Sequence, residues 1–164
     1  MIEIEGLKKR FGQSIALDEV SMHVRDGAMY GFVGPNGAGK TTTIRCMMGL
    51  LAADGGKLLI NGIDMEKEPK KALSQIGYIP DDFGVYDNLK VLEYMEFFAS
   101  CYGITGLSAR KRSMTLLDQV GLEGKSDFYV DSLSKGMKQR LCLARALVHN
   151  PSILIMDEPT AGRD

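Results

Sequence analysis

The residues with the clearest chemical use lie in one glycine-rich segment in the first half of the chain. This segment matches the phosphate-binding pattern G-x-x-x-x-G-K-[ST] at every fixed position, with Gly34, Pro35, Asn36, Gly37, Ala38, Gly39, Lys40 and Thr41. In such a loop, backbone N–H groups converge on the α- and β-phosphates of a nucleotide, and the following helix directs its positive end at the anion. We therefore predict a mononucleotide site in which Lys40 reaches the β- and γ-phosphates, the Thr41 hydroxyl binds Mg²⁺, and Thr42 also contacts the nucleotide.

The alternative for this segment is a glycine-rich turn with an incidental lysine. The neighbouring sequence favours the nucleotide site, because the apolar run at residues 28–33 predicts a buried strand before the loop. Residues 41–51 then have the length and composition of a helix. Glycines at Gly34 and Gly39 would leave space for the backbone to approach the phosphates closely, so we expect a side chain at Gly39 to block the nucleotide.

A pair of adjacent carboxylates, Asp157 and Glu158, follows a short apolar run at residues 153–156. A carboxylate at the end of a buried strand is costly unless it is paired or binds a metal ion. We expect Asp157 to hold Mg²⁺, directly or through water, beside the hydroxyl of Thr41. Glu158 would orient and polarise a water molecule for attack on the γ-phosphate. The alternative is a solvated Asp-Glu turn after a core strand.

Residue periodicity predicts the elements that must position these groups. Residues 1–24 alternate apolar and polar side chains as strands do, and residues 58–60 are expected to form a strand before an Asn61-Gly62 turn. Three helices are predicted in the second half, at residues 88–103, at residues 108–120 between a Ser108 N-cap and a Gly121 C-cap, and from near Gly136 to just before Asn150. This order predicts an α/β core with a helical insertion.

The bulk composition is that of a globular domain. The chain has 164 residues, 45% of them hydrophobic, and its 20 basic and 21 acidic residues leave a net charge of −1. Such a balance does not call for a polyanionic partner, so we expect no nucleic acid. No apolar run is long enough to span a bilayer, and the acidic start Met1–Glu5 argues against an export signal. The spacing of Cys46, Cys101 and Cys142 indicates neither a metal site nor a disulfide framework.

Residues 133–140, with the sequence LSKGMKQR, resemble the signature segment of ATP-binding cassette (ABC) proteins, in a form similar to that of exporters. Ser134 and Gly136 match the usual LSGGQ pattern, whereas Lys135 and Met137 depart from it. A serine and a glycine that open a helix place its positive N-terminus where it can bind a phosphate. In the family this phosphate belongs to ATP held by a second cassette, so the resemblance implies a head-to-tail dimer with ATP at its interface.

Further segments resemble landmarks of the same family. Phe11 matches the aromatic residue that stacks on adenine, and the alternative is one more core aromatic. Residues 78–82 match the Q-loop, with Asp81 where glutamine is usual, and this carboxylate would still bind Mg²⁺ or orient water. Residues 161–164 match the D-loop, with Arg163 in place of a leucine.

The resemblance implies a P-loop NTPase core with a mostly parallel sheet, an N-terminal antiparallel β subdomain and an inserted helical subdomain. We divide this single domain into a β subdomain with the phosphate-loop core (residues 1–86), a helical subdomain (residues 87–132), and a part with the signature helix, carboxylate strand and D-loop (residues 133–164). In the family, a further strand carries the switch histidine, and His149 precedes the carboxylate strand. We therefore expect a C-terminally truncated cassette that is unstable or inactive by itself.

The helical subdomain of the family, together with the Q-loop, forms a groove that receives a coupling helix from the transmembrane partner. A Met and aromatic cluster of this chain could line such a groove, with Tyr94, Met95, Phe97 and Phe98. The alternative for each of these side chains is core packing of an amphipathic helix.

The function implied by the resemblance is that of the ATP-binding and ATP-hydrolysing subunit of an ABC transporter, which uses ATP and Mg²⁺. Its catalytic residues would be Lys40, Asp81 and Glu158. The implied partners are a transmembrane permease and a second cassette, the direction is export, and the location is cytoplasmic, peripheral on the inner face of the cell membrane. The alternatives are a non-transport ABC ATPase of DNA repair, chromosome structure or translation, and a nucleotide-binding fragment without catalysis.

Overall fold

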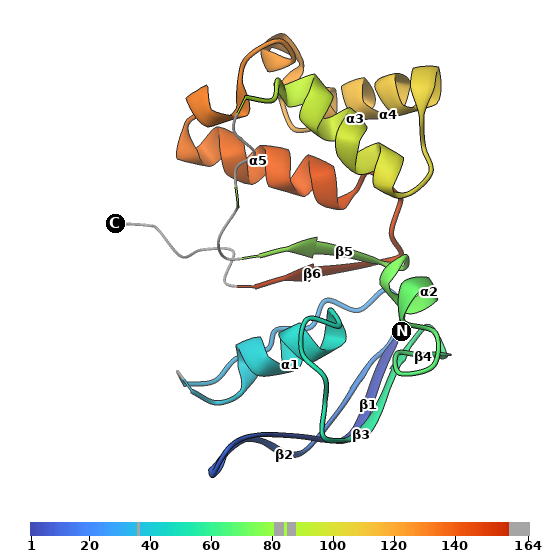
Figure 1. Cartoon of the computed structure of the whole chain (residues 1–164), viewed down its shortest axis with the longest axis vertical. Coiled ribbons are helices and arrows are strands. Elements are labelled where there is room, and N and C mark those ends of the chain that lie inside the picture. Colours follow the sequence, from blue (N-terminus) through green and yellow to red (C-terminus); the bar gives the residue numbers. More distant parts are fainter. Residues whose placement is uncertain (36, 81–83, 85–87, 158–164) are drawn as a thin grey trace. The chain divides into compact units, whose positions relative to one another are not determined.

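The structure of the protein, a computed structural model, describes residues 1–35, 37–80, 84 and 88–157, which Figure 1 draws as a coloured ribbon. The chain forms two compact units, Met1–Ile76 and Gly77–Asp164. The first unit contains the phosphate-binding pattern, and the second contains the signature-like segment and Asp157.

An antiparallel sheet makes up most of the first unit. Its strands occur in the order β2-β1-β3-β4, and they are β1 (Ile2–Phe11), β2 (Ser14–Val24), β3 (Gly55–Ile60) and β4 (Ile63–Asp64). Ile2, Ile4 and Leu7 of the central strand β1 are buried, and they anchor the core of this unit. The predictions of strands over residues 1–24 and at residues 58–60 are confirmed.

Two helices accompany this sheet. Helix α1 (Lys40–Met47) confirms the helix predicted behind the glycine loop, and it packs on β2. Its buried residues are Thr43, Ile44, Cys46 and Met47. Burial raises the pKa of the Cys46 thiol above its ordinary value, so this side chain packs as a neutral, apolar group. Helix α2 (Pro69–Leu73) is short and begins at a proline, whose fixed φ suits the first helical position.

The prediction of a buried strand at residues 28–33 is wrong. This segment belongs to neither sheet of the described chain, and Met29, Tyr30 and Val33 are exposed to solvent. A strand needs a neighbour that pairs with its backbone N–H and C=O groups, and an apolar run does not by itself supply that neighbour. The segment therefore leads into the glycine loop as irregular backbone.

The second unit combines three helices with a pair of strands. The helices are α3 (Val91–Cys101), α4 (Gly106–Gln119) and α5 (Lys135–Ala146), with short 3₁₀ turns at Glu123–Lys125 and Val130–Ser132. Strands β5 (Ile76–Ile79) and β6 (Ile153–Met156) pair with each other and run in the same direction (Figure 1). The three predicted helices and the strand at residues 153–156 are confirmed.

The two ends of α4 show which capping residues in the sequence predicted the helix boundaries correctly. The helix begins at Gly106 after a Thr105 N-cap, so the predicted Ser108 cap is wrong and this serine lies in the first turn. Serine and threonine are both good N-caps, and the sequence offered both within a few residues. Gly121 follows the end of α4 with a φ of 67°, as predicted from its preference for the left-handed conformation.

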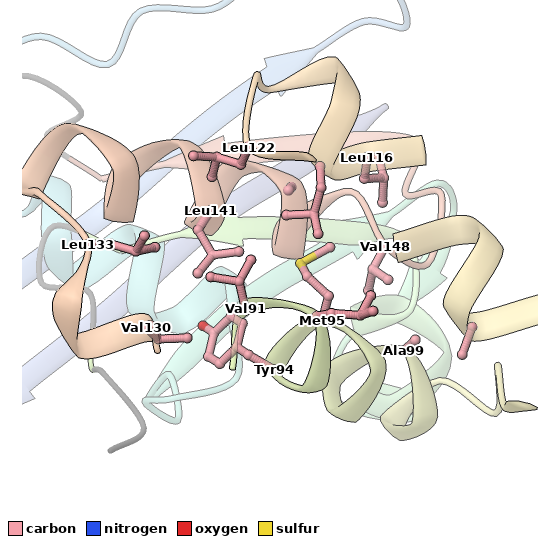
Figure 2. Packing of buried hydrophobic residues seen from close by; sticks show 14 residues of the cluster. Val91, Tyr94, Met95, Ala99, Leu116, Leu122, Val130, Leu133, Leu141 and Val148 are labelled. Atoms are coloured by element: carbon pink, nitrogen blue, oxygen red, sulfur yellow. The ribbon is translucent and has the colours of Figure 1, made fainter. Parts of the chain in front are cut away.

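The core of the second unit lies among α3, α4 and α5, whose side chains point toward one another in Figure 2. Its members are Val91, Leu92, Tyr94, Met95, Ala99, Ala109, Leu116, Leu117, Leu122, Val130, Leu133, Leu141, Ala144 and Val148. Tyr94 and Met95 are fully buried, so core packing is their observed role. Phe98 packs against this core, whereas Phe97 is 46% exposed and remains available on the surface of α3.

Two arginines, one on α4 and one on α5, each bind main-chain carbonyls at the C-terminal end of the other helix. Arg112 of α4 donates from Nη2 to the Leu147 carbonyl (2.8 Å) and from Nε to the Val148 carbonyl (3.2 Å), just past the end of α5. In return, Arg140 of α5 donates from Nη1 to the Val120 carbonyl (3.0 Å) at the end of α4. Cationic side chains suit helix C-termini because the last carbonyls lack partners within the helix and carry partial negative charge. Each helix therefore caps the other.

Among the residues that the structure describes, no helix combines the length and the apolar composition required to cross a membrane.

Candidate nucleotide-binding site

The glycine loop has a backbone shape that its sequence makes accessible. Gly37 and Gly39 have φ values of 82° and 83°, in the left-handed region that residues with a side chain rarely adopt. The Ala38 N–H donates to the Pro35 carbonyl at 3.1 Å and closes a turn within the loop. Gly39, a fixed position of the pattern, and Gly37, a variable one, therefore both suit glycine for a conformational reason.

Gly39 has a second constraint, which comes from its neighbours. A Cβ atom built on Gly39 would lie 2.7 Å from Leu17 Cδ2 and 2.8 Å from the Ala16 carbonyl oxygen, both on β2. Real Cβ atoms do not approach other atoms so closely, so the start of α1 lies directly against the backbone of β2. We predicted that a side chain at Gly39 would obstruct the nucleotide, and the described contacts add an obstruction to the packing of α1 itself.

The N-terminus of α1 is available to an anion. Gly39 is the N-cap and supplies no side chain to the first N–H groups, and the first turn contains no acidic residue. Thr43, which sequence reasoning missed, donates from N (2.8 Å) and from Oγ1 (2.9 Å) to the Gly39 carbonyl and is fully buried. Thr43 thus fastens the first helical turn, while the first N–H groups, which have no partner within the helix, point out of its N-terminus as a phosphate site requires.

Lys40 and the two following threonines occupy the first turn of α1. The Lys40 ammonium donates to the carbonyls of Gly34 and Pro35, the latter at 3.2 Å, so the side chain folds back over the loop. Thr41 and Thr42 are half-buried at the same end of the helix. Loop and helix therefore present together the groups that were predicted to contact phosphates. Asn36 lies outside the described residues.

Phe11 ends strand β1 and is 53% exposed. The alternative of a core aromatic therefore does not fit its surroundings. Lys9 Nζ lies 5.7 Å from the centroid of the Phe11 ring, within the range of a cation–π contact. An exposed aromatic ring on the unit that carries the glycine loop is suited to stacking on a base.

Ser134 and Gly136 lie at the N-terminus of α5. Ser134 is the N-cap, and its Oγ accepts a hydrogen bond from the Met137 N–H at 3.3 Å. Gly136 is exposed, and a Cβ built there would contact no atom within 4 Å. Lys135 and Lys138 add positive charge to a helix end that is already positive, which disfavours the isolated helix but favours an anionic partner. Sequence reasoning treated Lys135 only as a departure from the family pattern and overlooked this charge.

Asp157 follows β6 and is 7% exposed. Its N–H donates to the Ile79 carbonyl at 3.0 Å, so the residue extends the pairing of β6 with the end of β5. A buried carboxylate at a strand end agrees with the expected role as a metal ligand better than with a solvated turn. Glu158, Asp81 and the D-loop residues 161–164 lie outside the described residues.

Each unit carries one predicted oxygen ligand of the kind that Mg²⁺ takes at nucleotide sites. Within the described ranges, no group of three or more His, Cys, Asp or Glu side chains could hold a metal ion by itself. Mg²⁺ at phosphate sites usually takes one or two protein oxygens and completes its shell with phosphates and water. The Thr41 hydroxyl in the first unit and the Asp157 carboxylate in the second unit are each a donor of that kind.

Comparison with known proteins places these features in a family. Residues 17–161 match the model of the ABC transporter family. The chain is 40% identical over 164 residues to the probable multidrug ABC transporter ATP-binding protein YbhF of Escherichia coli (strain K12), covering 100% of this chain and 28% of that protein. It is 38% identical over 164 residues to the linearmycin resistance ATP-binding protein LnrL of Bacillus subtilis (strain 168), covering 100% of this chain and 53% of that protein.

A third relative is the Nod factor export ATP-binding protein I of Paraburkholderia xenovorans (strain LB400), which is 40% identical over 163 residues. That match covers 99% of this chain and 54% of the relative, so the chain spans between 28% and 54% of the length of these three proteins.

Solved structures show the same fold. An ATP-binding subunit of an ABC transporter superposes with a TM-score of 0.87 at 31% identity, covering 98% of this chain and 67% of that chain. The protein cbiO1 from Clostridium perfringens, part of the ABC transporter complex cbiONQ, gives a TM-score of 0.86 at 29% identity, covering 99% and 67%. The predicted α/β class with an antiparallel β part and a helical part is confirmed. Family match, sequence identity and shared fold agree, and the chain belongs to the ABC transporter family as one of its ATP-binding proteins.

Proposed function

We propose that this chain is the ATP-hydrolysing part of an ABC exporter. The observation that carries the proposal is the construction of the phosphate site. Left-handed glycines shape the loop, the N-terminus of α1 lacks a side-chain cap, and Lys40 lies over the loop. Such an arrangement binds the phosphates of a nucleoside triphosphate through backbone N–H groups and a single ammonium.

The chemistry assigned to the site is hydrolysis of ATP to ADP and phosphate. Lys40 holds the β- and γ-phosphates, and Thr41 and Asp157 would hold Mg²⁺, which would neutralise phosphate charge when bound. Glu158 accepts a proton from a water molecule while the water oxygen forms a bond to the γ-phosphorus and the bond from this phosphorus to the β–γ bridging oxygen breaks, which releases ADP. Asp81 would help to orient this water or would bind Mg²⁺. Phe11 stacks on adenine.

A second cassette completes the site in this proposal. Ser134 and Gly136 at the N-terminus of α5 bind the γ-phosphate of ATP held by the other cassette, in a head-to-tail dimer. Support comes from the exposure of this helix end and from the first-turn charges of Lys135 and Lys138, which an anion would offset.

The proposed membrane partner is a permease that contacts the helical part of the chain, residues 87–132, from the cytoplasmic side. The name of one relative, a Nod factor export ATP-binding protein, supports export as the direction. We expect the native protein to co-purify with a multi-span membrane protein after mild detergent extraction. Recovery as a free protein under conditions that preserve membrane complexes would contradict the transport role.

The test of nucleotide binding compares the variant Lys40→Ala with a control variant at another lysine. We expect Lys40→Ala to abolish binding of Mg-ATP to the native protein in a calorimetric titration, because the loop loses the ammonium that is assigned to the β- and γ-phosphates. Lys67→Ala is the control, since Lys67 is exposed and pairs with Asp64 at 3.6 Å, away from the glycine loop. Unchanged affinity of Lys40→Ala would refute the assignment of the phosphate site.

A further inference from the structure

Asp54 holds the end of strand β1 through three hydrogen bonds to consecutive residues. Its N–H donates to the Lys8 carbonyl at 2.9 Å. Its carboxylate accepts from Lys9 Nζ at 2.9 Å through Oδ1 and from the Arg10 N–H at 2.7 Å through Oδ2. The Lys9 and Arg10 bonds hold the pKa of Asp54 below its ordinary value of 3.8, so the carboxylate is ionised at neutral pH.

These contacts begin where the pairing of β1 with β3 stops, whereas the pairing of β1 with β2 continues through Arg10 and Phe11. The antiparallel pairing of β1 with β3 has its last partners at Lys8 and Gly55, after an irregularity in the register. The Asp54 carboxylate therefore continues the ladder for Arg10, in place of a backbone carbonyl. Arg10 immediately precedes Phe11, and Lys9 contacts both the Asp54 carboxylate and the face of the Phe11 ring. On its β3 side, the end of β1 next to Phe11 is thus held by a side chain from another segment, in addition to its backbone pairing with β2.

That segment is continuous with the phosphate loop. Helix α1 starts at the loop, and backbone hydrogen bonds order the connection that follows it, from the Gly49 N–H to the Cys46 carbonyl (3.0 Å) and from the Leu50 N–H to the Arg45 carbonyl (2.9 Å). The Leu51 N–H also donates to the Arg45 carbonyl at 3.2 Å. Hydrogen bonds therefore fix the chain from the start of α1 to Leu51, and Asp54, three residues further on, binds the end of β1.

We propose that Asp54 is a positioning residue that sets the separation between the phosphate loop and the Phe11 ring. This separation then determines the affinity for a ligand whose base and phosphates must be bound at the same time. The inference rests on the proposed function, in which Phe11 stacks on adenine. Asp54 itself contacts no nucleotide atom in this arrangement. Its loss leaves the phosphate loop intact but lets the end of β1 and its ring move.

The experiment compares ATP with inorganic tripolyphosphate, which carries three phosphates and no base. Calorimetric titrations of the native protein with each ligand, in the presence of Mg²⁺, give two dissociation constants for every variant. We expect Phe11→Ala to weaken ATP about tenfold, since stacking of a base on an aromatic ring is worth roughly that factor or more. We expect Asp54→Ala to weaken ATP roughly threefold to tenfold and to leave tripolyphosphate within about twofold.

Two further variants make the result specific. Glu19→Ala removes the ion pair of Glu19 with Lys8 (2.8 Å), which lies on the same strand, and is expected to change neither constant. In a Phe11→Ala background, Asp54→Ala should cause no further loss of ATP affinity, because the ring through which it acts is gone. Asp54→Asn, which retains an acceptor for the Arg10 N–H, should fall between the wild-type protein and Asp54→Ala.

An equal loss of ATP and tripolyphosphate affinity in Asp54→Ala would overturn the inference, because Asp54 would then act on the phosphate loop or on folding. Unchanged ATP affinity, or losses that add fully to those of Phe11→Ala, would overturn it as well. Failure of the proposed function is a separate result, since Lys40→Ala would then retain ATP binding.

Discussion

At the scale of single residues, three separate requirements call for glycine at position 39: the backbone conformation, the packing of α1 on β2, and access of the ligand. Its φ of 83° favours glycine, and the backbone of β2 occupies the place where a side chain would begin. The phosphate-binding pattern predicted glycine here from the needs of the ligand. The structure adds that the folded protein needs this glycine as well, because α1 and β2 meet at this point.

Gly39→Ala should therefore destabilise the fold more than Gly37→Ala, which is its matched control. Both residues have nearly the same φ, 83° and 82°, but a Cβ on Gly37 would meet no atom within 4 Å. We expect Gly37→Ala to lower the free energy of unfolding by about 1 kcal/mol through backbone strain alone. Gly39→Ala should lower it by about 2–4 kcal/mol, because overpacking adds to the strain. Urea denaturation measures both, and equal losses would show that the contact with β2 relaxes without cost.

At the scale of elements, helix α5 is fixed by arginine side chains at its middle and at its end. Arg140 and Arg112 link it to α4 through main-chain carbonyls. Arg145 links it to α3, donating from Nη1 to Tyr94 Oη at 3.0 Å and lying 5.1 Å from the Phe98 ring centroid. The N-terminal turn that carries Ser134 is at the opposite end of the helix from Arg145. The arginine contacts of α5 are thus made one to three turns away from that turn, while Leu133 and Met137 pack the turn itself against the core.

Arg112→Met should destabilise the helical unit by about 1–3 kcal/mol, because it removes charged hydrogen bonds to two carbonyls at the end of α5. Arg110→Met is the control on the same helix. Arg110 is exposed and lies 3.7 Å from Glu96, and exposed pairs of this kind contribute about 0.5 kcal/mol or less. Chemical denaturation monitored by circular dichroism compares the two, and similar losses would contradict the capping role of Arg112.

The helices and strands also show which structural features can be predicted from the sequence. Helices α1, α3, α4 and α5 and most strands were predictable because each segment shows its own periodicity or composition, and the glycine loop because its pattern is local, whereas the short helix α2 was missed. The strand expected at residues 28–33 was not, because strand formation depends on a neighbour that the segment itself does not specify. The contacts of Arg112 and Asp54 were equally hidden, since a charged residue in a sequence gives no sign of which distant carbonyl or N–H it will meet.

At the scale of the whole molecule, the chain contains the two kinds of phosphate-binding end that the proposed dimer needs. One is the glycine loop with α1, and the other is the N-terminus of α5 with its exposed Ser134 and Gly136. Relatives are about twice to four times as long as this chain, which covers 28% to 54% of their length. ATP-driven dimerisation is therefore best measured on the native product.

Ser134→Arg should prevent ATP-dependent dimerisation and leave ATP binding by the monomer unchanged, because a bulky cation replaces the small cap at the interface of the proposed dimer. We would measure mass by light scattering with Mg-ATP in a Glu158→Gln background, in which hydrolysis is expected to stall with the dimer closed. Ser108→Arg, at an exposed position of α4, is the control. A dimer that persists in Ser134→Arg would refute the contact between cassettes.

The mutual capping of α4 and α5 has a consequence for local unfolding. Fraying of the last turn of α4 releases the carbonyl that Arg140 binds, and fraying past the end of α5 releases those that Arg112 binds. Each loosened end removes an anchor from the other helix, so the two ends do not open independently. Amide hydrogens near both C-termini should then exchange with solvent deuterium at similar free energies of opening, as one cooperative unit rather than as two frayed helix ends.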